Sequence, residues 1–358
     1  DIDYANQKLK NLDERFENFK KIQNVFLNCY YDSPFTDELF VKLNLNKKID
    51  FSRYNYFYAS YAATSGKISK ANNIVQSGLN LYPRNLLLNQ YKIDLINKKN
   101  INKFNCQKET HVAAEILYIT ANALSSQSIY FSSNFYLNLA KFLNENFHSF
   151  DILLAENFYK INNLEKAKIV YKNLSKKGEA FKWYSTRQLA RIFIKEKKKD
   201  KAIKITSEAY NDLKVKEIYE TFDYAEFLKN NEKFEESIIY YSDVLNNIKK
   251  KHPLYTEATD GRGVAYERIG KWDKAEKDLL ASLNEDPNQA YVINYLAYSW
   301  IEQGIKVKKS LRMLEKANEL RSNDPFIIDS LGWALFKLER YKESKKYLQM
   351  AVKLMPGD

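Results

Sequence analysis

A small residue recurs along this chain with a period of about 34 residues, and no other feature of the sequence constrains the fold as strongly. One series of Ala and Gly occupies positions 121, 155, 190, 225, 263, 297 and 332. A second series of Ala and Ser follows 12 or 13 residues behind it, at positions 133, 167, 202, 237, 275, 310 and 344. Two separate series that keep one period predict repeated copies of one structural unit.

Each unit has the pattern of two amphipathic helices joined by a short turn. Apolar residues recur at i, i+3, i+4 and i+7 in two runs of about 13 residues. Polar turns separate the runs: Asn162-Asn163, Asn230-Asn231, Gly270-Lys271 and Glu339-Arg340. A short turn makes the helices antiparallel, and a small residue at each crossing lets their axes approach closely. Because one pair cannot bury its apolar face alone, the pairs must stack into an all-α solenoid with one continuous core.

The sequence before residue 113 departs from this phase. Ala59 and Ala71 fit one further unit, but residues 86–112 break the pattern, and we expect one helix of an incomplete pair followed by a loop. Residues 12–29 are helical in pattern, and Pro34 is expected in the first turn of the next helix. The predicted organisation is an N-terminal helical segment that could hold degenerate repeats at 1–50, one repeat with an incomplete helix pair and loop at 51–112, four repeats at 113–255, and three clear repeats at 256–358.

These units resemble the tetratricopeptide repeat family. The matching features are paired Leu and small residues, aromatic residues at set positions, and closing prolines: Leu154-Ala155, Leu296-Ala297, Leu331-Gly332, Phe234, Tyr266, Trp272, Tyr341, Pro287 and Pro356. The resemblance implies a right-handed superhelix of stacked antiparallel helix pairs. It also implies a non-enzymatic scaffold or adaptor that binds a peptide or partner protein in a concave groove.

The stretch YVINYLAYSWIEQG at residues 291–304 is similar to tetratricopeptide proteins of the proteobacterial cell envelope. Some of those proteins are adaptors that bring substrates to proteases. The similarity implies a bacterial protein in the periplasm or on the cell envelope, with the cytoplasm as the alternative.

The C-terminal residues suggest a further packing surface. Leu348, Ala351 and Val352 occupy positions where a following repeat would pack, whereas terminal repeats normally have a polar outer face. We therefore expect either that the chain is part of a longer protein or that its last helix meets a partner.

No catalytic or metal-binding pattern is present in the sequence. His111, His148 and His252 have no partner at the spacing of metal ligands. Two cysteines, Cys29 and Cys106, are too few for a disulfide framework or a zinc finger, and we expect a buried or surface thiol at each. No stretch approaches 18 uncharged apolar residues, so no transmembrane segment is predicted. We therefore expect no enzyme, no cofactor, no metal and no small-molecule substrate.

The net charge of +12 has two interpretations. The chain contains 57 Lys and Arg and 45 Asp and Glu, and 47 of the basic residues are Lys. Net charge mainly affects solubility and non-specific binding, and nucleic-acid sites more often cluster Arg with aromatic residues, so a nucleic-acid partner is not expected. The alternative function is a binder of nucleic acid or an anionic surface through the Lys excess, which a strong dependence of affinity on salt would reveal.

The groove should be lined by first-helix residues that contact neither the second helix nor the next repeat. These residues are Glu115, Tyr118, Asn122, Glu156, Tyr159, Arg187, Arg191, Tyr219, Phe222, Glu226, Asp260, Glu267, Tyr291, Asn294, Tyr298, Asp329 and Trp333. Aromatic residues and Arg are frequent at binding hot spots. Tyr and Trp at helical spacing are also frequent in cores, so part of this set is expected to be core.

The predicted centre of the groove is a pair of arginines. Arg187 and Arg191 are four residues apart and therefore share one helix face, where they could clamp a carboxylate. In the alternative interpretation, the two arginines pair with Glu156 and Glu226 and leave nothing for a ligand.

Overall fold

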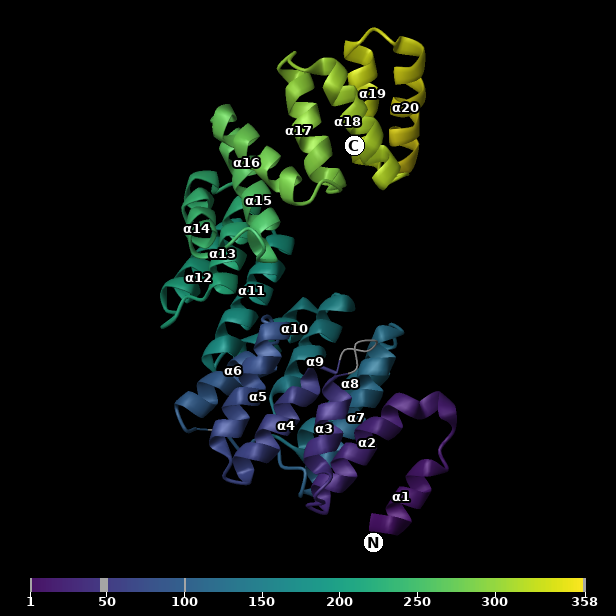
Figure 1. The fold of residues 1–358 in the computed structure, drawn as a ribbon, viewed down its shortest axis with the longest axis vertical. Coiled ribbons are helices and arrows are strands. Elements are labelled where there is room, and N and C mark those ends of the chain that lie inside the picture. The colour runs from purple at the N-terminus through teal and green to yellow at the C-terminus, as the bar shows by residue number, and fades with distance from the viewer. Residues whose placement is uncertain (1, 46–50, 100, 357–358) are drawn as a thin grey trace. The chain divides into compact units, whose positions relative to one another are not determined.

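The computed structural model describes residues 2–45, 51–99 and 101–356. Within them the chain forms twenty α-helices, one short 3-10 helix and no strand, which confirms the all-α prediction (Figure 1). The chain divides into two compact units, Asp1–Lys214 (unit 1) and Val215–Asp358 (unit 2). The predicted four-part division stays a prediction.

Unit 1 contains the first twelve of the described α-helices. They are α1 Ile2–Lys10, α2 Glu17–Tyr30, α3 Thr36–Asn44, α4 Arg53–Thr64, α5 Ile68–Leu81, α6 Leu86–Ile96, α7 Glu109–Ser126, α8 Tyr130–Leu143, α9 Ser149–Lys160, α10 Leu164–Leu174, α11 Glu179–Lys195 and α12 Lys199–Asn211. The 3-10 helix, Glu14–Phe16, precedes α2. The helix expected at Pro34 begins two residues later, at Thr36.

Unit 2 contains the other eight described helices. They are α13 Ile218–Asn230, α14 Phe234–Asn247, α15 Leu254–Arg268, α16 Trp272–Glu285, α17 Ala290–Glu302, α18 Val307–Leu320, α19 Pro325–Lys337 and α20 Tyr341–Leu354. Each odd-numbered helix packs against the even-numbered helix that follows it, and each pair then packs against the next.

The small residues lie at the helix crossings, as their period predicts. Every member of both series is inside a helix and buried. The Ser133 hydroxyl donates a hydrogen bond of 2.7 Å to the carbonyl oxygen of Ala121, its counterpart in the first helix. A Cβ atom added to Gly332 would lie 2.8 Å from the Leu348 side chain, so α19 and α20 approach too closely there for a larger residue. The repeat register is therefore confirmed.

The turn inside each helix pair contains a residue with left-handed backbone geometry. These residues have φ between +58° and +77°: Gly66, Ser128, Asn162, Lys197, Glu232, Gly270, Gly304 and Glu339. The left-handed residue closes the end of the first helix; in one turn the N–H of Lys271 donates to the carbonyl of Tyr266 at 2.9 Å. The turn expected at Asn230-Asn231 is centred slightly later, since α13 continues to Asn230.

The N-terminal helices pack against the later helices of unit 1 (Figure 1). As the broken phase predicts, α6 is followed by residues 97–99 and 101–108, which form no helix. α6 contacts α4, α5 and α11. The N–H of Ala180 at the start of α11 donates to Gln90 Oε1 at 3.1 Å. Gly178 permits this close approach, because a Cβ atom there would lie 2.2 Å from the same oxygen.

Cys29 and Cys106 form a disulfide bond, so the expectation of thiols was wrong. The bond joins α2 to the segment before α7, across a sequence separation of 77 residues. Neither cysteine has a local signal of pairing, because only the tertiary packing of the N-terminal helices places the segment that carries Cys106 beside α2. Cys29 is fully buried and Cys106 nearly so.

In the last helix, α20, two of the three residues expected to form a further packing surface face the interior of the helix pair. Ala351 is buried, and Leu348 is half-buried against Gly332 of the same helix pair. Val352 remains 62% exposed. The outer face of α20 is therefore not fully polar, and the expectation of a partner or a longer parent protein stays a prediction.

Candidate protein-binding face

Two first helices of unit 2 expose aromatic side chains along one face. Tyr291 and Tyr298 of α17 are seven residues apart and are 50% and 37% exposed. On α19, Phe326 and Phe336 are 56% and 45% exposed, and Trp333 between them is half-buried. Residues at these spacings lie on the same side of a helix. We call these five side chains the aromatic row.

The start of α19 is fixed by local sequence. The Asp324 carboxylate accepts hydrogen bonds from the N–H groups of Phe326 and Ile327, at 3.1 and 3.3 Å. Pro325 occupies the first helical position, where a missing N–H costs nothing. This cap sets the rotation of α19, so that Ile327 faces the core while Phe326 is exposed.

The aromatic row is held by contacts between neighbouring helices. Trp333 and Phe336 stack with ring centroids 5.4 Å apart and an interplanar angle of 13°. The indole N–H of Trp333 donates to the Glu302 carboxylate at the end of α17. Lys337 Nζ lies 4.8 Å from the Trp333 ring centroid. These contacts orient the rings and cover part of the Trp333 surface, while Phe336 stays 45% exposed.

Two carboxylates lie close to Tyr298. Burial raises the pKa of the Tyr298 hydroxyl, and the charges of Glu302 and Asp329 raise it further. Glu302 belongs to the same helix as Tyr298, whereas Asp329 belongs to α19. This end of the face therefore combines exposed rings with negative charge.

A second pair of carboxylates joins α13 and α15. Glu226 accepts a hydrogen bond from the Tyr241 hydroxyl. It also forms an ion pair with Lys229, in which Lys229 Nζ lies 2.8 Å from Glu226 Oε1. Burial raises the pKa of Asp260 to about 7, with Glu226 adding to the rise and Lys229 opposing it.

The remaining predicted residues of unit 2 have mixed placements. Phe222 is only 4% exposed and packs with Tyr241 in the core, so its prediction as a groove residue was wrong. Tyr219 is half-buried near His252, with ring centroids 5.8 Å apart. Glu267 accepts a hydrogen bond of 2.6 Å from the Tyr295 hydroxyl. Asn294 Oδ1 is buried and has no hydrogen-bond partner among the described residues.

In unit 1 the structure places Arg191 in an ion pair. Arg191 Nη2 lies 3.1 and 3.2 Å from the two carboxylate oxygens of Glu156, and its guanidinium lies 4.0 Å from the Tyr159 ring centroid. Glu156 also accepts a hydrogen bond of 2.7 Å from the Tyr171 hydroxyl. The alternative interpretation expected this pairing for Arg191, whereas Glu226, its other expected carboxylate, pairs with Lys229. The Arg187 guanidinium lies 5.9 Å from the Trp183 ring centroid.

Glu115 and Tyr118, also expected in the groove, are covered by α4. Arg53 donates to both carboxylate oxygens of Glu115 at 2.7 Å and to the Ser149 hydroxyl at 3.0 Å. Its guanidinium lies 3.9 Å from the Tyr118 ring centroid. Glu115 is fully buried. Sequence reasoning missed Arg53, because 62 residues separate it from Glu115 and no periodic signal connects them.

The predicted centre of the groove is divided between the two units. Glu156, Tyr159, Arg187 and Arg191 belong to unit 1, whereas Tyr219, Phe222 and Glu226 belong to unit 2. The convergence of these seven residues stays a prediction.

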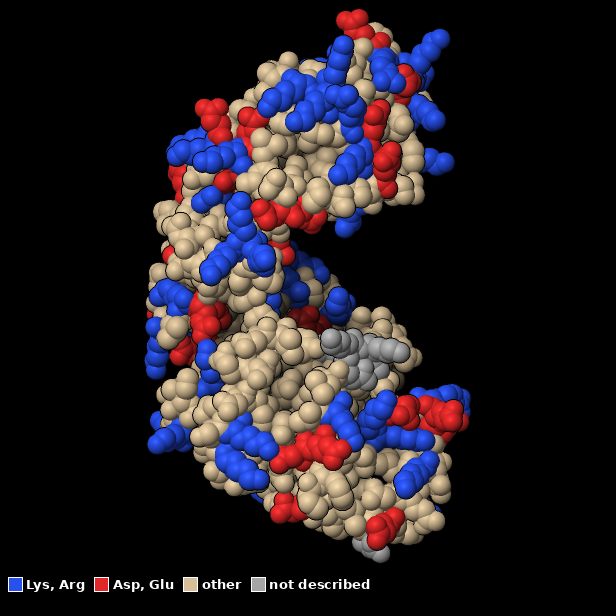
Figure 2. Space-filling view, in the orientation of Figure 1, with Lys and Arg blue, Asp and Glu red and all other residues tan. Residues whose placement is uncertain are grey.

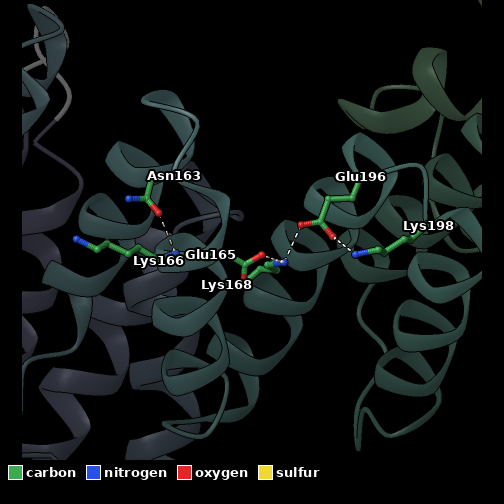
Figure 3. A network of polar contacts seen from close by, with 6 residues as sticks. All are labelled: Asn163, Glu165, Lys166, Lys168, Glu196 and Lys198. Carbon is green, nitrogen blue, oxygen red and sulfur yellow. Dashed lines mark hydrogen bonds and ion pairs between the residues drawn. The ribbon is translucent and has the colours of Figure 1, made fainter.

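A charged network links two successive repeats of unit 1 (Figure 3). Lys168 on α10 is largely buried and lies 2.6 Å from Glu165 and 2.7 Å from Glu196, which follows α11. Lys198 contacts the other oxygen of Glu196 at 2.7 Å. Hydrogen bonds from Lys168 and Lys198 lower the pKa of Glu196. This network explains part of the Lys excess by pairing within the fold.

A hollow of about 650 Å³ between α1, α2 and α7 has a mainly apolar lining that includes Leu9, Phe19 and Ile116, and it contains no predicted site residue. No group of three or more His, Cys, Asp and Glu in residues 2–45, 51–99 and 101–356 is placed to hold a metal ion. None of the described helices has the length and apolarity to cross a membrane.

Comparison with known proteins agrees with this architecture. No family model matches the chain. A TPR repeat-containing protein of Pseudomonas aeruginosa is 26% identical over 132 residues, which cover 37% of this chain and 22% of that protein. The chain therefore spans under a quarter of the length of that relative.

The structure of one known protein shows the same fold, and a second is similar to this chain without adding to that conclusion. A tetratricopeptide repeat protein from Parabacteroides merdae matches 69% of this chain and 94% of its own, with a TM-score of 0.53 and 13% identity. The C-terminal part of a TPR repeat-containing protein from Cytophaga hutchinsonii matches 67% of this chain and 96% of its own, with a TM-score of 0.46 and 15% identity.

Antiparallel helix pairs, stacked with small residues at every crossing, define an α-solenoid of the helical-repeat class. The period, the two series of small residues and the Pseudomonas relative identify the repeat. The chain has the fold of tetratricopeptide-repeat proteins and is similar in sequence to one of them.

Proposed function

We propose that this chain is a non-enzymatic scaffold or adaptor that binds a peptide or a segment of a protein partner along the aromatic row of unit 2. The observation that carries the proposal is the exposure of four large aromatic side chains on α17 and α19, two first helices that contact each other. Aromatic side chains supply large apolar contact area, and contiguous exposed apolar surface usually marks an interaction site.

The corresponding surface of unit 1 is less suited to a ligand. Arg53 already occupies the space over Glu115 and Tyr118. Arg191 is already paired with Glu156, so a ligand carboxylate would have to compete with that ion pair. Clamping of a carboxylate by Arg187 and Arg191 stays a secondary proposal for this reason.

The charge distribution favours a protein partner over nucleic acid. On the face shown in Figure 2, Lys and Arg side chains are interspersed with Asp and Glu over both units instead of forming one basic patch. Residues 215–358, which carry the aromatic row, contain 23 Lys and Arg and 24 Asp and Glu. Binding through phosphate contacts requires a local excess of positive charge.

The disulfide bond supports the envelope location implied by the sequence. Disulfide bonds persist in oxidising compartments such as the bacterial periplasm and are rare in the cytosol. We therefore place the chain in the periplasm or at the cell envelope as part of this proposal.

Site-specific photo-crosslinking tests the proposal. A photoreactive amino acid is introduced at Tyr298 or Phe326 in the aromatic row, and in matched variants at Lys309 or Lys345 on the exposed surface of second helices. The chain is expressed in a proteobacterial cell and irradiated. We expect discrete crosslinked protein bands only from the aromatic row. Equal crosslinking from both sets, or crosslinks to nucleic acid, would contradict the proposal.

A further inference from the structure

One helix of unit 1, α8, exposes three phenylalanines on one side. Phe131, Phe135 and Phe142 are 79%, 61% and 85% exposed, and Leu139 between them is 38% exposed. Residues at these spacings share one face of a helix. Ser133, the small residue of this helix, is buried on another side, where it bonds to α7. We call the four exposed apolar side chains the phenylalanine face.

The stacking of the repeats does not require aromatic residues at these positions. α8 is the second helix of its pair, and its three phenylalanines lie two residues before, two after and nine after the small residue. At the equivalent positions, α5, α12, α16, α18 and α20 carry only polar or charged side chains, and α10 and α14 carry one Ile each. The phenylalanine face is therefore a property of α8 and not of the repeat.

The next second helix, α10, adds positive charge. α10 and the three residues that follow it contain five Lys and one Glu, and that Glu is already paired with Lys168. Lys172, Lys176 and Lys177 are exposed and make no ion pair with any other residue that the structure describes. A local surplus of positive charge therefore faces solvent.

A hollow of about 530 Å³ lies beside two of these lysines. Its lining contains Lys176 and Lys177 with Lys103, His148 and two asparagines and, among the described residues, no Asp or Glu. Lys103 is already paired, 3.0 Å from Asp94. Ammonium groups and side-chain amides donate hydrogen bonds of the kind that phosphate oxygens accept. The hollow therefore has the chemistry of a phosphate-binding surface.

A second hollow, of about 390 Å³, connects this surface with α8. It shares the two lysines that follow α10 and also includes Lys141, which directly precedes Phe142. Asp151 in its wall is already paired with Lys141, and Glu145 is the other carboxylate of the lining. The cationic hollows and the phenylalanine face are therefore neighbours at the C-terminal end of α8.

We propose that the phenylalanine face of unit 1 docks on the surface of an anionic phospholipid bilayer. The rings enter the boundary between the headgroups and the acyl chains, and the lysines beside α8 bind lipid phosphates. The inference concerns unit 1 and does not depend on the aromatic row of unit 2.

The exposure of the rings favours a bilayer over a protein partner. Phe131 and Phe142 protrude from the helix, since most of each side chain is exposed. A protein partner would need a preformed pocket for each protruding ring, whereas fluid acyl chains close around it. An apolar helix face bordered by lysines is typical of helices that lie in the membrane interface, where anionic headgroups supply the complementary charge.

Co-sedimentation of the full chain with lipid vesicles tests the inference. One set of vesicles consists of phosphatidylcholine alone, and the other of phosphatidylcholine and phosphatidylglycerol in equal parts. We expect partitioning onto the anionic vesicles to be at least about tenfold stronger and to weaken as salt is added.

A first pair of variants tests the rings. Phe131→Ser with Phe142→Ser removes two rings from the phenylalanine face, and we expect at least about a tenfold loss of partitioning onto the anionic vesicles. The matched control, Leu81→Ser with Ile239→Ser, removes two exposed apolar side chains from α5 and α14 and should partition as the parent does.

A second pair of variants tests the cations. Lys176→Gln with Lys177→Gln removes the two unpaired lysines of the hollows, and we expect about a tenfold or greater loss of partitioning onto the anionic vesicles. Lys346→Gln with Lys353→Gln removes the same charge from exposed positions of α20 and should change partitioning by less than about twofold. The melting temperature of every variant is measured in parallel.

Several outcomes would overturn the inference. One is a parent chain that ignores both kinds of vesicle or binds them equally, and another is an equal loss in the variants and their matched controls. A third is a parent dimer that Phe131→Ser with Phe142→Ser converts to monomer without changing vesicle binding, because the face would then join two copies of the chain. None of these outcomes bears on the aromatic row, which belongs to unit 2.

Discussion

Asp260 is a single residue whose surroundings make its charge unfavourable. Burial disfavours the ionised carboxyl, and the carboxylates of Glu226 on α13 and Glu257 on its own helix act in the same direction, while Lys229 opposes them. The nearby hydroxyl of Tyr241 on α14 is already bonded to Glu226. Lys229 is therefore the positive charge that partly offsets this effect.

The pKa of Asp260 predicts a dependence of stability on pH. Its folded-state pKa of about 7 exceeds the unfolded value of 3.8, so the folded chain binds a proton that the unfolded chain has released. Stability therefore falls as the pH rises from about 4 to 7. We expect Asp260→Asn to raise the free energy of unfolding by about 1–3 kcal/mol at pH 8, and by progressively less toward pH 4.

Urea unfolding of both proteins at several pH values measures this difference. The raised pKa of Asp260 would be contradicted if Asp260→Asn were less stable than the parent at pH 8. It would also be contradicted if the difference in free energy of unfolding were the same at every pH.

The disulfide bond gives a second prediction at the scale of residues. Linking Cys29 to Cys106 closes a long loop and reduces the entropy of the unfolded chain. We expect the double substitution Cys29→Ser with Cys106→Ser to lower the free energy of unfolding of unit 1 by about 4 kcal/mol. Denaturation of the parent with and without reductant provides the matched control. Free thiols in the unreduced parent would contradict the bond.

Residue identities could be predicted where one residue type satisfies a local requirement. The small residues at helix crossings, such as Ala121 and Ser133, were found from their period alone. The Cys29–Cys106 bond and the Arg53–Glu115 pair could not be found this way. Their partners are far apart in sequence, and only the packing of the N-terminal helices brings them together.

At the scale of helices, the turns within the pairs carry unequal strain. The same left-handed position is occupied by Gly270 in one pair and by Glu232 in another. The left-handed backbone conformation destabilises a residue with a Cβ atom by about 1–2 kcal/mol, whereas glycine adopts it without this cost. We expect Glu232→Gly to raise the stability of unit 2 by about 1 kcal/mol.

The control for this turn prediction is the reverse change at the equivalent position. Gly270→Ala should lower stability by a similar amount, although open space surrounds its Cβ position. Thermal unfolding of the two variants checks the signs. Two changes of the same sign would show that backbone geometry does not govern these turns.

Close packing at the helix crossings predicts that larger side chains there lower the free energy of unfolding. Ala202 is fully buried where α12 crosses α11. Replacing it with Leu should overpack the crossing and lower the free energy of unfolding by about 1–3 kcal/mol. Lys204→Leu, at an exposed position of the same helix, is the control and should change stability little. An unchanged free energy of unfolding in Ala202→Leu would contradict close packing of α12 against α11 at this position.

Helices were easier to predict than their boundaries. The period locates a helix pair in each unit, because the pattern of small and apolar residues follows from how helices pack. It does not determine where each helix ends; Asn230 remains helical because the left-handed residue that stops α13 is Glu232. The same limit applies at Pro34, where the next helix begins later than expected.

At the scale of the molecule, the predicted groove residues differ in accessibility between the two units. In unit 1, Glu115 and Tyr118 are covered by α4, and Arg191 is held by Glu156. In unit 2, Tyr298 and Trp333 remain on an accessible face. Periodicity marks all of these positions alike, because it cannot show which ones another part of the chain covers.

The central claim is that the aromatic row of unit 2 is the binding face. The most direct measurement compares the affinity of two variants for the partner that crosslinking identifies. Tyr298→Ser with Phe336→Ser removes two exposed rings from the row, and Ile239→Ser with Val352→Ser removes two exposed apolar side chains from second helices. The account predicts a loss of affinity of at least about tenfold for the first variant only, with both melting temperatures unchanged. Equal affinities of the two variants, or a greater loss in the second, would contradict it.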